Sequence, residues 1–493
     1  MKVIMVMFDT LNRRFLEPYG GCEVMTPNFT RLAGKTVQFQ NCYAASLPCI
    51  PARREMHTGR YNFLHRSWGP LEPFDDSMPN ILKNKGIHTH LVSDHGHYWE
   101  AGGATYHTQF TTWDNVRGQE GDPWQAVVGE VPDSDPNFVP YTDGIRKILY
   151  DQNLANRTGI KCKEDFPLVK TFNGGIEFIK QNKNRGDWFL QIESFSPHEP
   201  FMASEEFKAM YPCDTSVGKR YEWPDYSPVN GSSEEEINQV RYAHFASLSM
   251  CDEQLGRVLD LMDAEDMWKD TMLIVNTDHG FMLGEHDFWA KNYMPCYNEI
   301  VHIPLFIWDP RAAVKGETRE ALVQTVDMPV TVLDFFGIEP SKDMEGHSLL
   351  PILKEDADVR EAGLYGTFGG HICCTDGRYT YMRTPRDEKG PLYEYTLMPT
   401  HMMEMFSVEE LRTMERHEGF DFTKEVPLMQ IQVDSSTRCC VKEDFLFDVT
   451  KDPKQVSPIN DVDVVEYMEK LMIALLQKND APNEIYQRFG FTI

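Results

Sequence analysis

Residues 2–10 read KVIMVMFDT, in which six consecutive apolar residues (3–8) end abruptly at Asp9. A short, continuous apolar run is typical of a strand that is covered on both faces, as in a parallel sheet. Runs of the same kind predict further strands at residues 90–93, 188–193, 272–277 and 303–308. Asp278 ends one of these runs just as Asp9 ends the first.

Helical patterns alternate with these runs. The clearest covers residues 234–262, and either Ser232 or Ser233 can cap it because each has a glutamate three residues further on. Alternation of strands and helices predicts an α/β fold, with a large mixed, mostly parallel sheet sandwiched by helices. Ligands of such sheets bind beyond the carboxyl ends of the strands, where Asp9 and Asp278 are expected.

The character of the sequence changes near residue 370. Short runs at 371–375, 379–383 and 392–397 predict antiparallel strands, and a helix is expected at 464–477. We therefore expect an α/β domain at residues 1–370 and a smaller α+β unit, an antiparallel sheet plus a helix, at 371–493. The stretch 112–165 is polar, rich in Gly, Pro and Asp, and predicts an insertion of loops over the functional face.

Charge and apolar content exclude several classes of protein. The 493 residues include 48 basic and 76 acidic side chains, a formal charge of −28, which argues against a nucleic-acid binder. No apolar run reaches the length needed to span a membrane, so no membrane association is expected. The first run is also short for a secretory signal, and we expect a cytoplasmic protein. The 11 cysteines are predicted to be reduced thiols.

The most specific pattern is LPCIPARREMHTGR at residues 47–60, which contains C-x-P-x-R followed by T-G. Pro51 suits the first turn of a helix, which places Cys49 at the helix N-terminus. Free N–H groups and the helix dipole favour an anion there, and Arg53 adds a cation one turn on.

This motif resembles the signature of the formylglycine-dependent sulfatases, a family of the alkaline phosphatase superfamily. The late segment FLFDVTKDP at residues 445–453 resembles another element of the family, so the resemblance covers most of the chain. It implies that residues 1–370 are an alkaline-phosphatase-like catalytic domain. It also implies that a formylglycine-generating maturation enzyme oxidises Cys49, and that the hydrate of the resulting aldehyde is the nucleophile.

The resemblance further implies a divalent metal, usually calcium, with magnesium or manganese as alternatives. Its ligands would be Asp9, Cys49, Asp278 and His279. Many members of the family carry a second aspartate after the first, where this chain has Thr10, and the family varies between Asp-Asn and Asp-His at the second site. One fewer carboxylate leaves the metal less neutralised.

Two more segments match the family. Residues 284–291 contain G-x-H followed by Lys291, which the resemblance assigns to the sulfate group. The sequence PHEPF at residues 197–201 places His198 at the ester oxygen of the leaving group, where histidine is a natural proton donor near neutral pH. Lys291 and His198 are therefore predicted to bind substrate and to take part in catalysis, together with Arg53.

One segment departs from the family, which usually carries G-K-x-H beside the formylglycine. Here the sequence is SDHGHY at residues 93–98, and Asp94 takes the place of the lysine. Either His95 or His97 would supply the catalytic imidazole. Asp94 is predicted to contact substrate or to orient a histidine. An additional metal site and a plain wall of the cleft are the alternatives for this segment.

The sequence thus predicts a sulfatase that hydrolyses a sulfate monoester, by analogy that of a small sulfated carbohydrate. Lys291, Arg53 and the metal would hold developing negative charge. A phosphodiester or phosphonate monoester hydrolase on the same scaffold is the nearest alternative. A non-catalytic binding protein with unmodified Cys49 is the alternative from another class. The oligomeric state stays open.

Overall fold

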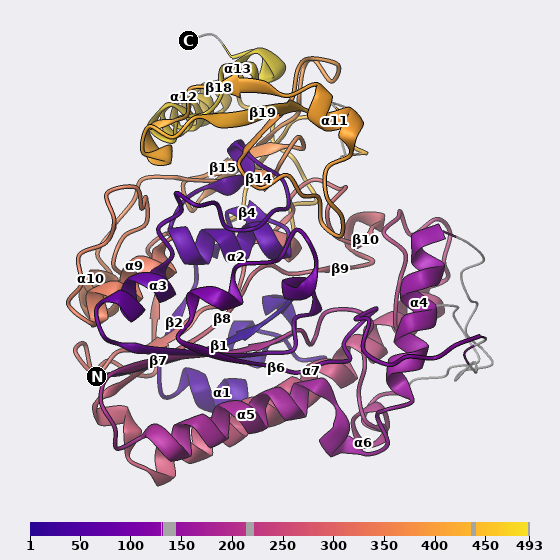
Figure 1. The fold of residues 1–493 in the computed structure, drawn as a ribbon, viewed down its shortest axis with the longest axis vertical. Helices are drawn as coiled ribbons and strands as arrows, with labels where there is room; N and C mark the ends of the chain where they lie inside the picture. Colours follow the sequence, from indigo (N-terminus) through magenta and orange to yellow (C-terminus); the bar gives the residue numbers. More distant parts are fainter. Residues whose placement is uncertain (130, 132–143, 213–220, 435–439, 492–493) are drawn as a thin grey trace.

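The structure is a computed structural model that describes residues 1–129, 131, 144–212, 221–434 and 440–491. Its main sheet has eight strands in the order β12-β2-β11-β8-β1-β7-β5-β6 within these ranges (Figure 1). The strands are β1 Lys2–Phe8, β2 Val37–Phe39, β5 His88–Ser93, β6 Thr112–Asn115, β7 Trp188–Ser194, β8 Thr271–Thr277, β11 Phe306–Trp308 and β12 Glu317–Arg319. Only β11 runs antiparallel to its neighbours, β8 and β2, so the predicted mixed, mostly parallel sheet is confirmed.

Helices cover both faces of this sheet (Figure 1). Alternate residues of β1 enter two separate cores: Val3 and Met5 belong to one, and Ile4, Val6 and Phe8 to the other. The first core includes residues of α2, α3 and α9, and the second includes residues of α1, α5 and α7. These helices are α1 Pro27–Ala33, α2 Cys49–Thr58, α3 Met78–Asn84, α5 Pro167–Asn182, α7 Glu234–Ala264 and α9 Asp327–Phe335.

The long predicted helix is α7, and its N-cap is Ser233. The Ser233 hydroxyl accepts from the Glu236 N–H, and the Glu236 carboxylate accepts from the Ser233 N–H. This reciprocal pair satisfies two of the free N–H groups that begin any helix. Of the two predicted candidates, Ser233 and not Ser232 is therefore the N-cap.

A second sheet lies at the C-terminal end of the molecule, in the order β20-β16-β15-β14-β4. Its strands are β20 Phe445–Asp448, β16 Tyr379–Arg383, β15 Ile372–Thr375, β14 Gly363–Thr367 and β4 Ser46–Leu47, and α12 Val462–Lys478 packs against it. The predicted division at residue 370 therefore falls inside the β14–β15 hairpin rather than between two sheets. Because β4 leads directly into α2, this sheet also supports the helix that carries Cys49.

The remaining elements are small, apart from α4. They are β3 Cys42–Tyr43, β9 Met282–Leu283, β10 Trp289–Ala290, β13 Val323–Gln324, β17 Tyr393–Thr396, β18 Glu415–His417, β19 Leu428–Gln432, α4 Gly144–Arg157, α6 Glu205–Lys208, α8 Asn298–Val301, α10 Leu350–Glu355, α11 Val408–Arg412 and α13 Asn483–Phe489.

The predicted insertion at 112–165 is more regular than its composition suggests. It begins with β6, the edge strand of the main sheet, and its second half contains α4; residues 130 and 132–143 lie outside the described part. No helix in the described ranges combines the length and apolarity that crossing a membrane requires.

Candidate active site

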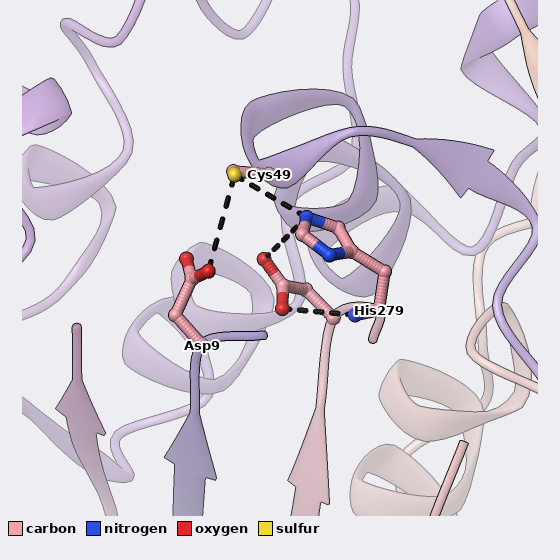
Figure 2. A group of neighbouring side chains, drawn as sticks. Asp9, Cys49 and His279 are labelled. Atoms are coloured by element: carbon pink, nitrogen blue, oxygen red, sulfur yellow. Dashed lines mark hydrogen bonds and ion pairs between the residues drawn. The ribbon is translucent and has the colours of Figure 1, made fainter. Parts of the chain in front are cut away.

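Cys49 is the first residue of α2, and only 2% of its surface is exposed. Its Sγ lies 3.3 Å from Nε2 of His279, 3.4 Å from Nζ of Lys291 and 4.0 Å from Oδ1 of Asp9. Figure 2 shows Asp9 below the sulfur and His279 beside it, each joined to the sulfur by a dashed line. Burial, and then the Asp9 carboxylate, raise the pKa of the thiol well above its usual value, so Cys49 is protonated here.

The two predicted aspartates come from adjacent parallel strands. β1 and β8 pair in register, so Asp9 and Asp278 follow them at the same edge of the sheet. Oδ1 of Asp278 accepts from the N–H groups of Thr10, at 3.0 Å, and His279, at 2.9 Å. These backbone donors fix the carboxylate and leave its orientation little freedom.

Thr10 stands where many sulfatases carry a second aspartate. Its hydroxyl donates to Asp9 and accepts from Nζ of Lys291 at 3.0 Å. Its φ of +64° is unusual for a β-branched residue, and such strain is concentrated at functional sites. Thr10 therefore connects the lysine to the first carboxylate but supplies no negative charge.

Asp9, Cys49, Asp278 and His279 can each place one ligand atom so that all four atoms lie within 4.8 Å of one another. Nδ1 of His279 is 3.0 Å from the carbonyl oxygen of Gly280, and donation to that oxygen leaves Nε2 free to bind a metal. Two carboxylates and one imidazole suit a hard or intermediate divalent cation. The residues present thus fit the metal that the sequence predicts.

Arg53 lies at the centre of a buried charge cluster. Its Nη2 donates to Asp9 at 2.8 Å, its Nη1 to Asp278 at 2.6 Å, and its Nε to Glu193 at 2.7 Å. Burial opposes the charge of Arg53, but Glu193 and then Asp9 raise the pKa of the guanidinium well above its usual value. Arg53 therefore stays charged. Its three partners come from three neighbouring strands: Glu193 lies in β7, and Asp9 and Asp278 directly follow β1 and β8.

Glu193 was missed by the sequence analysis, which treated it as the end of an apolar strand. It lies in β7, is fully buried, and accepts through Oε2 from Tyr98 and Gln191, each at 2.8 Å. Burial raises the pKa of Glu193, although Arg53 opposes that shift. A glutamate next to the C-terminal end of a predicted interior strand is itself a signal, because a buried carboxylate needs a partner.

Nζ of Lys291 lies 3.4 Å from Sγ of Cys49, and the charge of Lys291 acts on His198. Burial opposes the charge of Lys291, but the carboxylates of Glu199 and Asp9 raise its pKa above the ordinary value. Burial, and then Lys291, hold the pKa of His198 well below its usual value, so the imidazole is neutral. The His198 ring packs 4.1 Å from the ring of Phe195, and its Nδ1 contacts the carbonyl oxygen of Glu199.

The two candidate imidazoles occupy different environments. Nε2 of His95 lies 3.4 Å from Oδ2 of Asp9, and neither ring nitrogen of this buried residue has a hydrogen-bond partner among the described residues. His97 instead contacts Glu100 at 2.7 Å and lies 3.8 Å from Glu120. His95 is therefore the imidazole next to Asp9, whereas His97 lies next to Glu100 and Glu120.

Asp94 contacts protein groups through both oxygens. Oδ1 accepts from the N–H of Phe195 at 2.7 Å, and Oδ2 accepts from Gln119 at 2.9 Å. Burial raises its pKa to about 7. Asp94 ties the 117–122 turn to the segment that carries His198, and its predicted contact with substrate stays a prediction.

Comparison with known proteins agrees with this arrangement. The family model for sulfatases matches residues 2–338, and the model for the C-terminal region of N-sulphoglucosamine sulphohydrolase matches residues 284–413. The chain is 28% identical over 385 residues to the multifunctional alkaline phosphatase superfamily protein PehA of Trinickia caryophylli, covering 67% of this chain and 71% of that one. It is 24% identical to an N-acetylglucosamine-6-O-sulfatase of Bacteroides thetaiotaomicron, covering 74% and 73%.

Two solved structures share the fold over nearly the whole chain. One, in complex with its substrate D-glucosamine-2-N,6-O-disulfate, has a TM-score of 0.67 at 17% identity and covers 98% of both chains. A phosphonate monoester hydrolase of Agrobacterium radiobacter has a TM-score of 0.62 at 18% identity and covers 97% of this chain and 95% of that one. On its sequence match and its fold, this chain belongs to the sulfatase family, the sulfuric ester hydrolases of the alkaline phosphatase superfamily.

Proposed function

We propose that this enzyme hydrolyses a sulfate monoester of a carbohydrate, and that a formylglycine made from Cys49 by a maturation enzyme is its nucleophile. The observation that carries this proposal is the position of Cys49 Sγ, which begins α2 within 4.0 Å of Asp9, His279 and Lys291. Relatives named for N-acetylglucosamine-6-O-sulfate and for iduronate 2-sulfate support a carbohydrate substrate.

The charge of the site supports an anionic substrate only with a bound cation. Asp9, Asp278 and Glu193 supply three formal negative charges against two positive charges, on Arg53 and Lys291. A divalent ion at the first two carboxylates reverses the sign of the cluster. When bound there, the ion supplies Lewis-acid polarisation of the ester oxygens and lowers the pKa of the nucleophilic hydroxyl. Calcium is our first choice, with magnesium or manganese as alternatives.

The chain's own residues divide the remaining work. Lys291 and Arg53 stabilise negative charge that develops on the sulfate oxygens, in a site that excludes water. His198 protonates the leaving oxygen. His95 then accepts the proton of the second hydroxyl of the hydrate, so that sulfate is expelled and the aldehyde is restored. The neutral ring of the buried His95 suits a proton acceptor. His198 must take up a proton before it can donate one, and the negative charge of a bound ester favours its protonated form.

A phosphonate monoester or phosphodiester is the second candidate substrate. Thr10 replaces a carboxylate and His279 supplies nitrogen, so the metal retains more positive charge than in an Asp-Asp site. A more positive centre suits a more highly charged transferring group. The shared fold with phosphonate monoester hydrolases is consistent with this candidate.

Mass spectrometry of the tryptic peptide 36–53 tests the nucleophile directly. Protein from its native host, or co-expressed with a formylglycine-generating enzyme, should show the aldehyde at Cys49, and turnover of an aryl sulfate should rise in proportion to the aldehyde fraction. The matched control is Cys49→Ala, which removes both the aldehyde and the turnover. Native protein that shows only the thiol would refute the proposed nucleophile and favour a non-catalytic binding protein.

A further inference from the structure

The hairpin that carries Lys291 has an unusual backbone. Its strands β9 and β10 pair with each other, and the residues around Lys291 include four non-glycine residues with positive φ: His286 at +51°, Asp287 at +64°, Ala290 at +69° and Asn292 at +85°. Such conformations are unfavourable for residues with a Cβ and persist only where the surrounding structure holds them. The position of Lys291 therefore depends on contacts that the hairpin makes with other elements.

Glu285 makes several of these contacts from the turn of the hairpin, and only 7% of its side chain is exposed. Its Oε2 accepts from the N–H of Leu283, and its Oε1 accepts from Nη1 of Arg14. Arg241 of α7 lies 3.7 Å from Oε1 and donates to the carbonyl oxygen of Leu283 at 2.9 Å. The carboxylate therefore closes the turn and joins it to two other parts of the chain.

Arg14 lies in the segment that follows β1 and that also contains Thr10. This segment contacts the hairpin again at the centre, where Nζ of Lys291 donates to the Thr10 hydroxyl at 3.0 Å. The side-chain amide of Asn12 also donates to the carbonyl oxygen of Phe281, which precedes the hairpin, at 3.0 Å. The position of the hairpin against this segment therefore decides where the lysine lies.

The amine of Lys291 leaves little room for a shift of the hairpin. Its side chain is 2% exposed, and Nζ lies 3.4 Å from Sγ of Cys49 and 3.9 Å from Oδ1 of Asp9. Charge stabilisation requires a donor within hydrogen-bond distance of the oxygen it serves, so a displacement of about 1 Å is enough to weaken it. Because Lys291 is not one of the four metal-ligand candidates, such a displacement should weaken the binding of an oxyanion and spare that of the metal.

We propose that Arg14 and Glu285 are positioning residues for Lys291. Their ion pair fixes the hairpin against the segment after β1 and thereby sets the affinity of the centre for the sulfate group. This inference rests on the proposed function, in which Lys291 binds sulfate. Both residues act through the lysine rather than on the ester.

The test is a double-mutant cycle on the affinity for inorganic sulfate. Calorimetry on calcium-loaded protein gives the Kd for the wild type, Arg14→Gln, Glu285→Gln and the double variant. Each single variant should raise the Kd about threefold or more, and the double variant should show no larger rise, because the pair acts as a unit. The Kd for calcium should change less than about twofold in all of them, whereas a general distortion of the centre would weaken both ligands.

Glu23→Gln is the matched control, because Glu23 also lies near Arg14, at 4.0 Å, but is 44% exposed and outside the hairpin. It should leave both Kd values unchanged. A sulfate Kd that neither single variant alters, rises that multiply in the double variant, or a wild type that binds no sulfate would contradict the inference.

Turnover of 4-nitrophenyl sulfate on the same samples, with their formylglycine content measured, tests the proposed function separately. A wild type that carries formylglycine but does not hydrolyse this ester would contradict the proposed function. The calorimetric cycle would still decide whether Arg14 and Glu285 position Lys291, since sulfate binding requires no turnover.

Discussion

Nε of Arg53 donates a 2.7 Å hydrogen bond to Oε1 of Glu193, and both side chains are almost completely buried. Glu193 thereby fixes the guanidinium plane and directs Nη1 and Nη2 to Asp278 and Asp9. Among the described residues, the other donors to this carboxylate are the neutral groups of Tyr98 and Gln191. Glu193 is therefore a positioning residue for the cation of the motif.

The loss of stability on replacing Glu193 should depend on whether the new side chain keeps an acceptor for Arg53. Glu193→Leu removes the partner of a buried cation and should lower the free energy of unfolding by about 3–5 kcal/mol. Glu193→Gln keeps an acceptor oxygen and should cost less, about 1–3 kcal/mol. Urea denaturation measures both, and equal stability of the two variants and the wild type would contradict the assignment.

The sequence reveals the elements with strong local signals and misses those that depend on tertiary contacts. β1 contains a continuous apolar run and β7 and β8 are mostly apolar, and the α7 cap is a local motif, so these elements are readable from the sequence. β4 has only two residues and forms because β14 pairs with it, so no local pattern marks it. The second sheet therefore reaches back to the Cys49 motif in a way that composition does not reveal.

The same limit applies within the site. Asp9 and Asp278 are predictable because each follows a recognisable strand. His95 and His97 cannot be separated by sequence, since they differ only in which carboxylate the fold brings to each. The sequence does not identify Glu193 because its partner, Arg53, is 140 residues away in the chain.

The role of His198 predicts a dependence on the leaving group. His198→Gln removes the proton donor, so alkyl sulfates, whose alcohols leave poorly, should lose about 10²–10⁴-fold in kcat/KM. 4-Nitrophenyl sulfate, whose phenol leaves without protonation, should lose far less. Steady-state kinetics on both esters checks this, with His401→Gln as a control at a half-exposed ring paired with Glu410. Equal losses on both esters would refute proton donation by His198.

Metal removal should affect stability as well as turnover. Binding at Asp9 and Asp278 stabilises the folded state by about 2.7 kcal/mol when the free ion is at 100 times its Kd. Chelation should therefore lower Tm and abolish turnover, and added calcium should restore both. Asp278→Asn should lose the metal-dependent part of Tm, whereas Asp260→Asn, at a 71% exposed side chain, should keep it. A Tm that changes with neither chelator nor calcium would contradict a metal site at Asp9 and Asp278.

The buried His244 of α7 predicts part of the decrease in folding stability at acid pH. His244 packs against the rings of Phe15 and Phe201, and burial lowers its pKa to about 3. Its contribution to stability is complete above its unfolded pKa of about 6.5 and is lost as the pH falls from there toward 3. Relative to neutral pH, the loss is about 2–3 kcal/mol at roughly pH 4.5.

His244→Leu removes that titration. The difference in unfolding free energy between the wild type and this variant should therefore shift in favour of the variant as the pH falls from about 7 to about 4.5. Urea denaturation at several pH values measures it. A difference that stays constant over that interval would show that His244 is not a buried neutral base.

The most direct test of the central claim is the ratio of kcat/KM for two esters with the same phenol, an aryl sulfate and an aryl methylphosphonate, on protein whose formylglycine content has been measured. Sulfate ester hydrolysis at the Cys49 centre predicts a higher kcat/KM for the sulfate, and loss of that turnover in Cys49→Ala. A higher kcat/KM for the phosphonate would contradict the account and assign the centre to phosphorus esters.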